Sequence, residues 1–244
     1  MNQRTRTPLV IGIVVAIVVI VAVTVLLATG GDDDAETSST TVAPGATPST
    51  PADASAGDGG ESTTTIPEVL VGEVFPVTVD GTPLPLFESP DDDPAVGATP
   101  PTLTGQDFDG EQVVIGPGEA SPTLVVFLAH WCPHCNAEVP RLIELHDDGR
   151  IPENLRVVAV STGVAPDRPN FPPSEWIVDM GWPYEVMADG IDFDRGVFVG
   201  ADAYGLSSFP YMVMIGSDGT VVDRWTGESG VDELAERIAA GAAA

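Results

Sequence analysis

Two residues of this sequence can carry redox or metal chemistry together, because Cys132 and Cys135 are the only cysteines in the 244-residue chain. Their spacing alone permits a disulfide staple, a pair of metal ligands or a working redox pair. A disulfide that closes so short a loop removes little chain entropy, which counts against a staple. A zinc site needs four ligands, or three and a water, so the histidines would have to contribute. Copper(I), which prefers soft sulfur ligands, stays open as an alternative.

The elements expected around the cysteines predict how the two thiols are presented. The apolar run TLVVFLA (123–129) is typical of a buried central strand, and a helix is expected from about Cys132 to about His146. Unpaired N–H groups and the helix dipole favour a thiolate at a helix N-terminus. We therefore expect Cys132 to be the exposed nucleophile and Cys135 the buried resolving thiol. The expected core-facing residues of this helix are Cys135, Val139, Leu142, Ile143 and His146.

Three histidines accompany the pair. His134 lies between the cysteines, and as an imidazolium or a hydrogen-bond donor it would favour the Cys132 thiolate. Such an effect stabilises the reduced form and makes the oxidised pair a stronger oxidant. The alternative is that His134 is simply a solvent-exposed loop residue. His130 is interpreted as a surface neighbour, and His146 as a complement to the dipole at the C-terminal end of the helix.

The N-terminal part of the chain predicts a membrane anchor followed by a linker. Residues 9–29 are uncharged and long enough to span a bilayer, with Arg4 and Arg6 before them and three aspartates after them. The positive-inside rule then places residues 1–8 in the cytoplasm and the rest outside, where disulfides persist. A cleaved signal peptide is the alternative. Residues 30–67, rich in Thr, Ser, Pro and Asp, read as a disordered linker.

Charge and hydrophobic patterning limit the possible partners of the chain and indicate the fold class of residues 68–244. With 9 basic against 37 acidic residues, the net charge of −28 argues against a nucleic-acid partner. Residues 68–96 are interpreted as a small N-terminal extension with two short strands. From residue 97 to residue 244, strands and helices alternate, which predicts an α/β domain with a central mixed sheet flanked by helices. One of these helices, in PPSEWIVDMG (172–181), is expected to have Ser174 as its N-cap.

Two separated motifs resemble the thioredoxin superfamily, specifically its membrane-anchored TlpA/ResA-like thiol-disulfide oxidoreductases. WCPHCNAEVP (131–140) is similar to the family pattern W-C-x-x-C-x-x-E-x-P, and AYGLSSFPYMVMIGSDGTVVDRWTG (203–227) is similar to its second signature. The resemblance implies a thioredoxin-like fold in which Cys132 and Cys135 are catalytic and Pro210 follows a cis peptide bond. It also implies that Trp131, Phe209 and Pro210 contribute to a substrate-binding face; for Trp131, a structural packing role alone is the alternative.

The sequence departs from thioredoxins in two places. Thioredoxins carry a buried acid six residues before the first cysteine, where this chain has Val126. Glu138 is expected to assist proton transfer instead, as the resemblance implies; a surface salt bridge on the helix is the alternative. The Pro133-His134 dipeptide resembles the strongly oxidising DsbA-type centre, so the scaffold is similar to reductases and the dipeptide to an oxidase.

These features together predict an extracytoplasmic, single-pass membrane protein that exchanges disulfides with protein thiols, using an unidentified redox partner and no bound cofactor or metal. Three alternatives remain. They are a copper(I)-binding chaperone, a thiol peroxidase and a redox-inert interaction module. Peroxiredoxins share the fold but carry a threonine three residues before the reactive cysteine, where this chain has Ala129.

Overall fold

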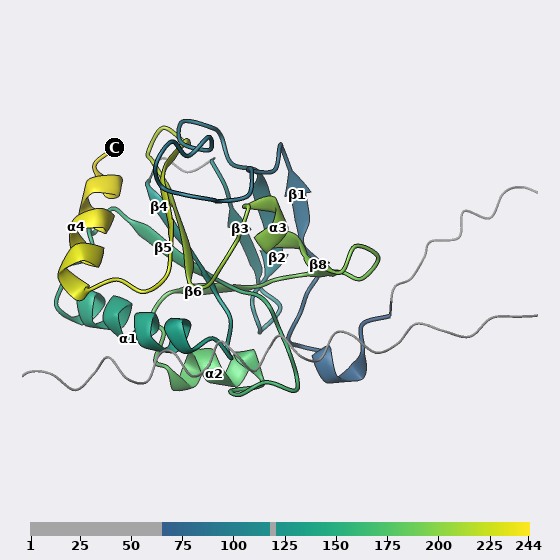
Figure 1. The fold of residues 1–244 in the computed structure, drawn as a ribbon. Helices are drawn as coiled ribbons and strands as arrows, with labels where there is room; N and C mark the ends of the chain where they lie inside the picture. Colours follow the sequence, from purple (N-terminus) through teal and green to yellow (C-terminus); the bar gives the residue numbers. More distant parts are fainter. Residues whose placement is uncertain (1–64, 118–120) are drawn as a thin grey trace, which may run out of the picture. The chain divides into compact units, whose positions relative to one another are not determined.

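The computed structural model describes residues 65–117 and 121–244 (Figure 1). The expected cytoplasmic segment 1–8, the anchor 9–29 and nearly all of the linker 30–67 lie outside these residues, so they stay predictions. Within the described ranges, no helix combines the length and the apolar character needed to cross a membrane.

The centre of the fold is an eight-stranded mixed sheet in the order β1-β2-β6-β5-β4-β9-β10, with β3 paired to β2. The central strands β4, β5 and β6 are parallel, and the other pairings are antiparallel. The predicted mixed sheet is therefore confirmed. The strands are β1 (Thr78–Asp80), β2 (Thr102–Gln106), β3 (Gln112–Ile115), β4 (Thr123–Leu128), β5 (Arg156–Ser161), β6 (Glu185–Ala188), β9 (Tyr211–Ile215) and β10 (Val221–Thr226). A separate hairpin of β7 (Ile191–Asp192) and β8 (Val197–Phe198) was not predicted.

Both faces of the central strands are covered, which explains why these strands are apolar throughout rather than alternating. Leu124, Val126 and Leu128 of β4 face a cluster that contains residues of α1, α2 and α4. Val125 and Phe127 face the opposite cluster, which includes α3 and part of the segment before β2. Figure 1 shows α1 and α2 below the sheet and α3 beside β1 and β2. The helices are α1 (Pro133–Asp147), α2 (Pro173–Asp179), α3 (Val199–Ala203) and α4 (Val231–Ala242).

Helix α1 begins where the sequence predicted, one residue after Cys132. Proline at its first position lacks an N–H that would be unpaired there anyway, so Pro133 suits the start of the helix. The predicted core-facing stripe is wrong at its end. Leu145 is buried, whereas His146 is exposed and its Nδ1 lies 3.0 Å from the Tyr184 hydroxyl. Buried Leu145 continues the apolar stripe through Leu142, because offsets of three and four residues share a helix face.

The segment before β2 is attached to the sheet and to α2. It begins with a 3-10 turn (Glu68–Leu70), and β1 pairs antiparallel with β2 at the edge of the sheet. The second short strand predicted in this segment does not form. The expected N-cap role of Ser174 is also wrong, because Ser174 lies inside α2. Both its N–H and its hydroxyl donate to the carboxylate of Glu73, at 3.0 and 2.7 Å.

Candidate active site

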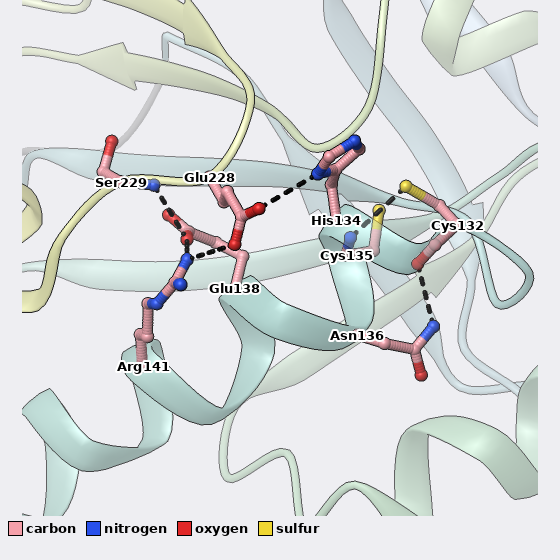
Figure 2. A network of polar contacts seen from close by, with 8 residues as sticks. All are labelled: Cys132, His134, Cys135, Asn136, Glu138, Arg141, Glu228 and Ser229. Carbon is pink, nitrogen blue, oxygen red and sulfur yellow. Dashed lines mark hydrogen bonds and ion pairs between the residues drawn. The ribbon is translucent and has the colours of Figure 1, made fainter. Parts of the chain in front are cut away.

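The two cysteines meet at the N-terminus of α1. Cys132 is the N-cap residue, and its Sγ accepts a hydrogen bond from the Cys135 N–H at 3.3 Å (Figure 2). Both cysteines are free thiols. The first sulfur therefore receives an N–H that no helical carbonyl can reach, and it also lies at the positive end of the helix dipole. This geometry favours negative charge on Cys132 Sγ.

One sequence-based expectation about this pair is wrong. Cys132 is not exposed, since only 4% of its surface is accessible, and Cys135 is fully buried as predicted. The Cys132 side chain turns back over the first turn of α1 to accept its hydrogen bond, and it belongs to the apolar cluster beneath. Partly buried Trp131 and Phe209 pack against the same cluster.

Burial separates the two thiols chemically. Burial of Cys135 raises the pKa of its thiol far above the ordinary value, and the neighbouring Cys132 and the charge of Glu138 add to that rise. Cys135 therefore holds its proton at neutral pH. A base must remove that proton before Cys135 can attack another sulfur.

Glu138 is a buried carboxylate that also forms an ion pair with Arg141 of the same helix, so the alternative of a salt bridge on the helix is met in part. Burial raises the pKa of Glu138, and hydrogen bonds from the Ser229 N–H (3.1 Å) and Arg141 (3.0 Å) oppose that rise. Both of these donors bind Oε2. Oε1 is buried and has no hydrogen-bond partner among the described residues. An unpaired carboxylate oxygen one helical turn from Cys135 is suited to accept a proton.

His134 is held by a residue that the sequence did not single out. The ring lies mostly in solvent, with 63% of the side chain accessible, and its Nδ1 lies 3.1 Å from Oε1 of Glu228. Oε2 of the same carboxylate accepts a hydrogen bond from Arg141 at 2.8 Å. Figure 2 shows the resulting chain from His134 through Glu228 and Arg141 to Glu138. It links the two residues expected to tune the thiolate.

Asn136 joins the CxxC turn to α2, and it also donates a hydrogen bond to the His130 carbonyl. The Asn136 side chain donates to the Cys132 carbonyl at 2.8 Å and accepts from the Trp176 indole of α2 at 3.1 Å. The interpretation of His130 as a surface residue is wrong. It is fully buried, with Nδ1 2.7 Å from the Pro169 carbonyl and Nε2 accepting from the Ala165 N–H. Burial lowers the pKa of His130, which fits a neutral ring.

The residues predicted to form the substrate face lie together beside the first cysteine. Trp131 and Phe209 meet edge to face, with 5.8 Å between their ring centroids, and the Trp131 indole donates to the Gly163 carbonyl at 2.7 Å. The peptide bond between Phe209 and Pro210 is cis, as the resemblance implied. The guanidinium of Arg168 lies 5.6 Å from the centre of the Trp131 ring.

Four polar residues of this site were not identified from the sequence: Asn136, Arg141, Glu228 and Ser229. Arg141 follows Glu138 by three residues, a spacing that places two side chains on one helix face, so this pair was detectable. Glu228 and Ser229 lie about 90 positions from their partners, and no local pattern marks them. Among the described residues, no group of three or more His, Cys, Asp or Glu side chains is arranged to hold a metal ion.

Comparison with known proteins places this geometry in a family. The sequence matches the AhpC/TSA family over residues 96–224, more than half of the chain. It is 24% identical over 136 residues to the thiol-disulfide oxidoreductase ResA of Halalkalibacterium halodurans, covering 54% of this chain and 71% of ResA. It is 32% identical over 107 residues to the thiol:disulfide interchange protein CycY of Rhizobium leguminosarum, covering 44% of this chain and 50% of CycY.

Solved structures of the same kind are also similar. A secreted Mycobacterium tuberculosis disulfide oxidoreductase described as homologous to Escherichia coli DsbE is 23% identical, with a TM-score of 0.45. The match covers 56% of this chain and 94% of that one. The predicted relationship to ResA-like proteins is confirmed by the family and sequence matches. The chain belongs to the AhpC/TSA family, as a thioredoxin-like domain whose relatives are named thiol-disulfide oxidoreductases and interchange proteins.

Proposed function

We propose that this protein is a thiol-disulfide oxidoreductase that exchanges disulfides with protein substrates through Cys132 and Cys135. The observation that carries the proposal is the contact between the Cys135 N–H and Cys132 Sγ at the start of α1. It gives the pair one sulfur suited to carry charge and one thiol that stays protonated. The names of ResA and CycY support the same reaction class.

In the reducing direction, the Cys132 thiolate attacks one sulfur of a substrate disulfide. The substrate S–S bond breaks, a mixed disulfide forms on Cys132, and the first substrate thiolate leaves. Glu138 then takes the proton of Cys135, whose thiolate attacks Cys132 Sγ and releases the second substrate thiolate. Two electrons pass to the substrate, and the protein is left with a Cys132–Cys135 disulfide. In the oxidising direction, a substrate thiolate attacks that disulfide at Cys132 and the same steps run in reverse.

The route by which a substrate sulfur reaches Cys132 Sγ suggests a role for the neighbouring aromatic residues. Cys132 is nearly buried, and partly buried Trp131 and Phe209 pack against the same apolar cluster. We propose that a substrate sulfur approaches Cys132 past these two rings. These rings would bind the apolar residues next to the substrate cysteine, whereas Pro210 is itself buried and would shape the loop. A disulfide-linked substrate segment would then lie against the loop that contains the cis peptide bond.

The proposal includes a location outside the cytoplasmic membrane, where protein disulfides persist. The uncharged segment 9–29, with arginines before it and aspartates after it, supports a single-pass anchor with the cysteines on the outer side. Protease added to spheroplasts is expected to degrade the domain without detergent. Full protection until detergent is added would contradict this location.

The reaction is tested with single cysteine variants and a fluorescent peptide that carries one disulfide. Cys132→Ser is expected to reduce exchange to the uncatalysed rate. Cys135→Ser is expected to accumulate a mixed disulfide with the peptide that dithiothreitol releases, because the resolving thiol is missing. Folding of both variants is checked by thermal unfolding. Exchange that survives Cys132→Ser, or a Cys135→Ser variant that never links to the peptide, would refute the proposal.

The alternatives are tested with the same proteins. A peroxidase would consume hydrogen peroxide in the presence of a thiol reductant. A copper(I) chaperone would bind one copper(I) ion, and Cys132→Ser would abolish this binding. We expect peroxide consumption to be much slower than disulfide exchange, and we expect no stoichiometric binding of copper(I). Peroxide turnover faster than peptide exchange would replace the proposed function with a peroxidase.

A further inference from the structure

The loop after β10 brings a carboxylate to the CxxC turn. Gly227 has a positive φ of 84°, which lets the chain turn sharply as it leaves the sheet. The next two residues then contact α1 along two of its turns. The Glu228 side chain binds His134 in the first turn and Arg141 two turns on, and the Ser229 N–H binds Glu138 between them.

Glu228 uses both of its oxygens on cationic or donor groups. Oε1 lies 3.1 Å from Nδ1 of His134, and Oε2 lies 2.8 Å from Nη1 of Arg141. The hydrogen bond from His134, and then that from Arg141, lower the pKa of the Glu228 carboxyl. The carboxylate is therefore ionised at neutral pH and acts as an acceptor toward both partners.

An ionised acceptor at Nδ1 fixes the histidine ring. A carboxylate oxygen can only accept, so the proton must lie on Nδ1 and the ring is held facing Glu228. Nε2 is then the one ring nitrogen left for the reacting sulfurs or a substrate. Nucleophile sites with a histidine commonly use a third group to orient the base in this way.

We propose that Glu228 is a positioning residue that holds His134 in the orientation and tautomer in which it stabilises the reduced cysteine pair. The inference rests on the proposed function, because it concerns the redox chemistry of that same pair. Arg141 joins Glu228 to Glu138, so the loop after β10 contacts both residues that act on the thiols. Glu228 would thereby make the oxidised pair a stronger oxidant.

A simple surface ion pair makes a different prediction. Exposed ion pairs contribute little to stability. Losing one that does not orient His134 gives no reason for the disulfide form to become favoured. Glu228 as a positioning residue affects the redox equilibrium and leaves unfolding nearly unchanged. The reduction potential of the cysteine pair therefore separates the two roles.

The experiment measures the equilibrium of the Cys132/Cys135 pair with reduced and oxidised glutathione, read by thiol alkylation. Glu228→Gln keeps the size of the side chain and removes its charge. We expect it to shift the equilibrium toward the disulfide at least fivefold, about 20 mV toward more negative potential at about 30 mV per tenfold change. Asp232→Asn is the matched control, since Asp232 is 89% exposed and binds only Arg150 among the described residues. It should leave the potential unchanged.

A double-mutant comparison connects the effect to the histidine. In a His134→Ala background, Glu228→Gln is expected to have no further effect on the potential, because the group it positions is absent. Equal shifts in both backgrounds, or a Glu228→Gln potential equal to that of the wild type, would overturn the proposal. A wild-type pair that never equilibrates with glutathione would overturn the proposed function as well. Normal equilibration with an unchanged Glu228→Gln variant would overturn the positioning role alone.

Discussion

At the scale of single residues, the buried acid of this site lies on the helix, whereas thioredoxins carry it on the central strand. Val126 of β4 is fully buried in the apolar cluster beneath α1, where a carboxylate in the thioredoxin position would lie. Glu138 supplies the buried carboxylate instead, and its charge contributes to the raised pKa of the Cys135 thiol. The Cys135 thiol and the carboxylate proposed to take its proton therefore both lie on α1, three residues apart.

This arrangement predicts that Glu138→Gln slows the step in which Cys135 resolves the mixed disulfide. General base catalysis contributes about 10²–10⁴-fold to rates, so we expect a loss of at least about 10²-fold. The rate at which the mixed disulfide disappears, followed by rapid mixing and quenching, measures this step directly. Since only ionised Glu138 accepts a proton, the wild-type rate should fall as pH decreases through the raised pKa of Glu138, and this dependence should vanish in the variant.

The exposed Glu144 on the same helix provides the control for that measurement. Glu144→Gln removes a carboxylate from α1 without touching the cysteine pair, so its resolution rate should equal that of the wild type. A Glu138→Gln variant that resolves as fast as Glu144→Gln would show that another group removes the proton.

At the scale of elements, the sequence predicted what local patterns encode. The apolar run of β4 and the start of α1 beside Cys132 both follow from signals within a few residues, and the structure has them. His130 shows the limit of such reasoning. Its burial depends on Ala165 and Pro169, which close over it from a loop 35 and 39 residues away.

Long-range contacts also explain the missed capping of α2. A serine near the start of a helix is a good N-cap by local rules, yet Ser174 lies inside the helix and donates to Glu73. The unpaired N–H is satisfied by a carboxylate 101 residues earlier. A single sequence does not encode such a pairing in any period or spacing. The same reason hides Glu228, whose partner His134 lies 94 positions before it.

At the scale of the whole molecule, a buried ion pair ties the segment before β2 to the far edge of the sheet. Arg224 of β10 and Asp93 are 0% and 2% exposed, and Arg224 also donates to the Pro85 carbonyl at 2.8 Å and to the Tyr211 hydroxyl at 3.0 Å. Burial acts to raise the pKa of Asp93, and hydrogen bonds from Arg224 and the Ala95 N–H outweigh it, so the pKa is lowered. Asp93 is therefore ionised in the folded protein.

Asp93→Asn should destabilise the fold strongly, because it leaves the Arg224 charge buried without its counter-ion. Removing one partner of a buried pair costs about 3–5 kcal/mol, whereas Asp223→Asn, which removes the partner of the partly exposed Arg237, should cost at most about 1 kcal/mol. Urea unfolding measures both. Because the pKa of Asp93 is lowered on folding, its contribution is present above the usual carboxyl range and is lost as pH falls through the lowered value. The difference in the free energy of unfolding between wild type and Asp93→Asn should therefore become smaller in acid. If the two Asn variants are equally stable at neutral pH, the Arg224–Asp93 pair does not hold the segment to the sheet.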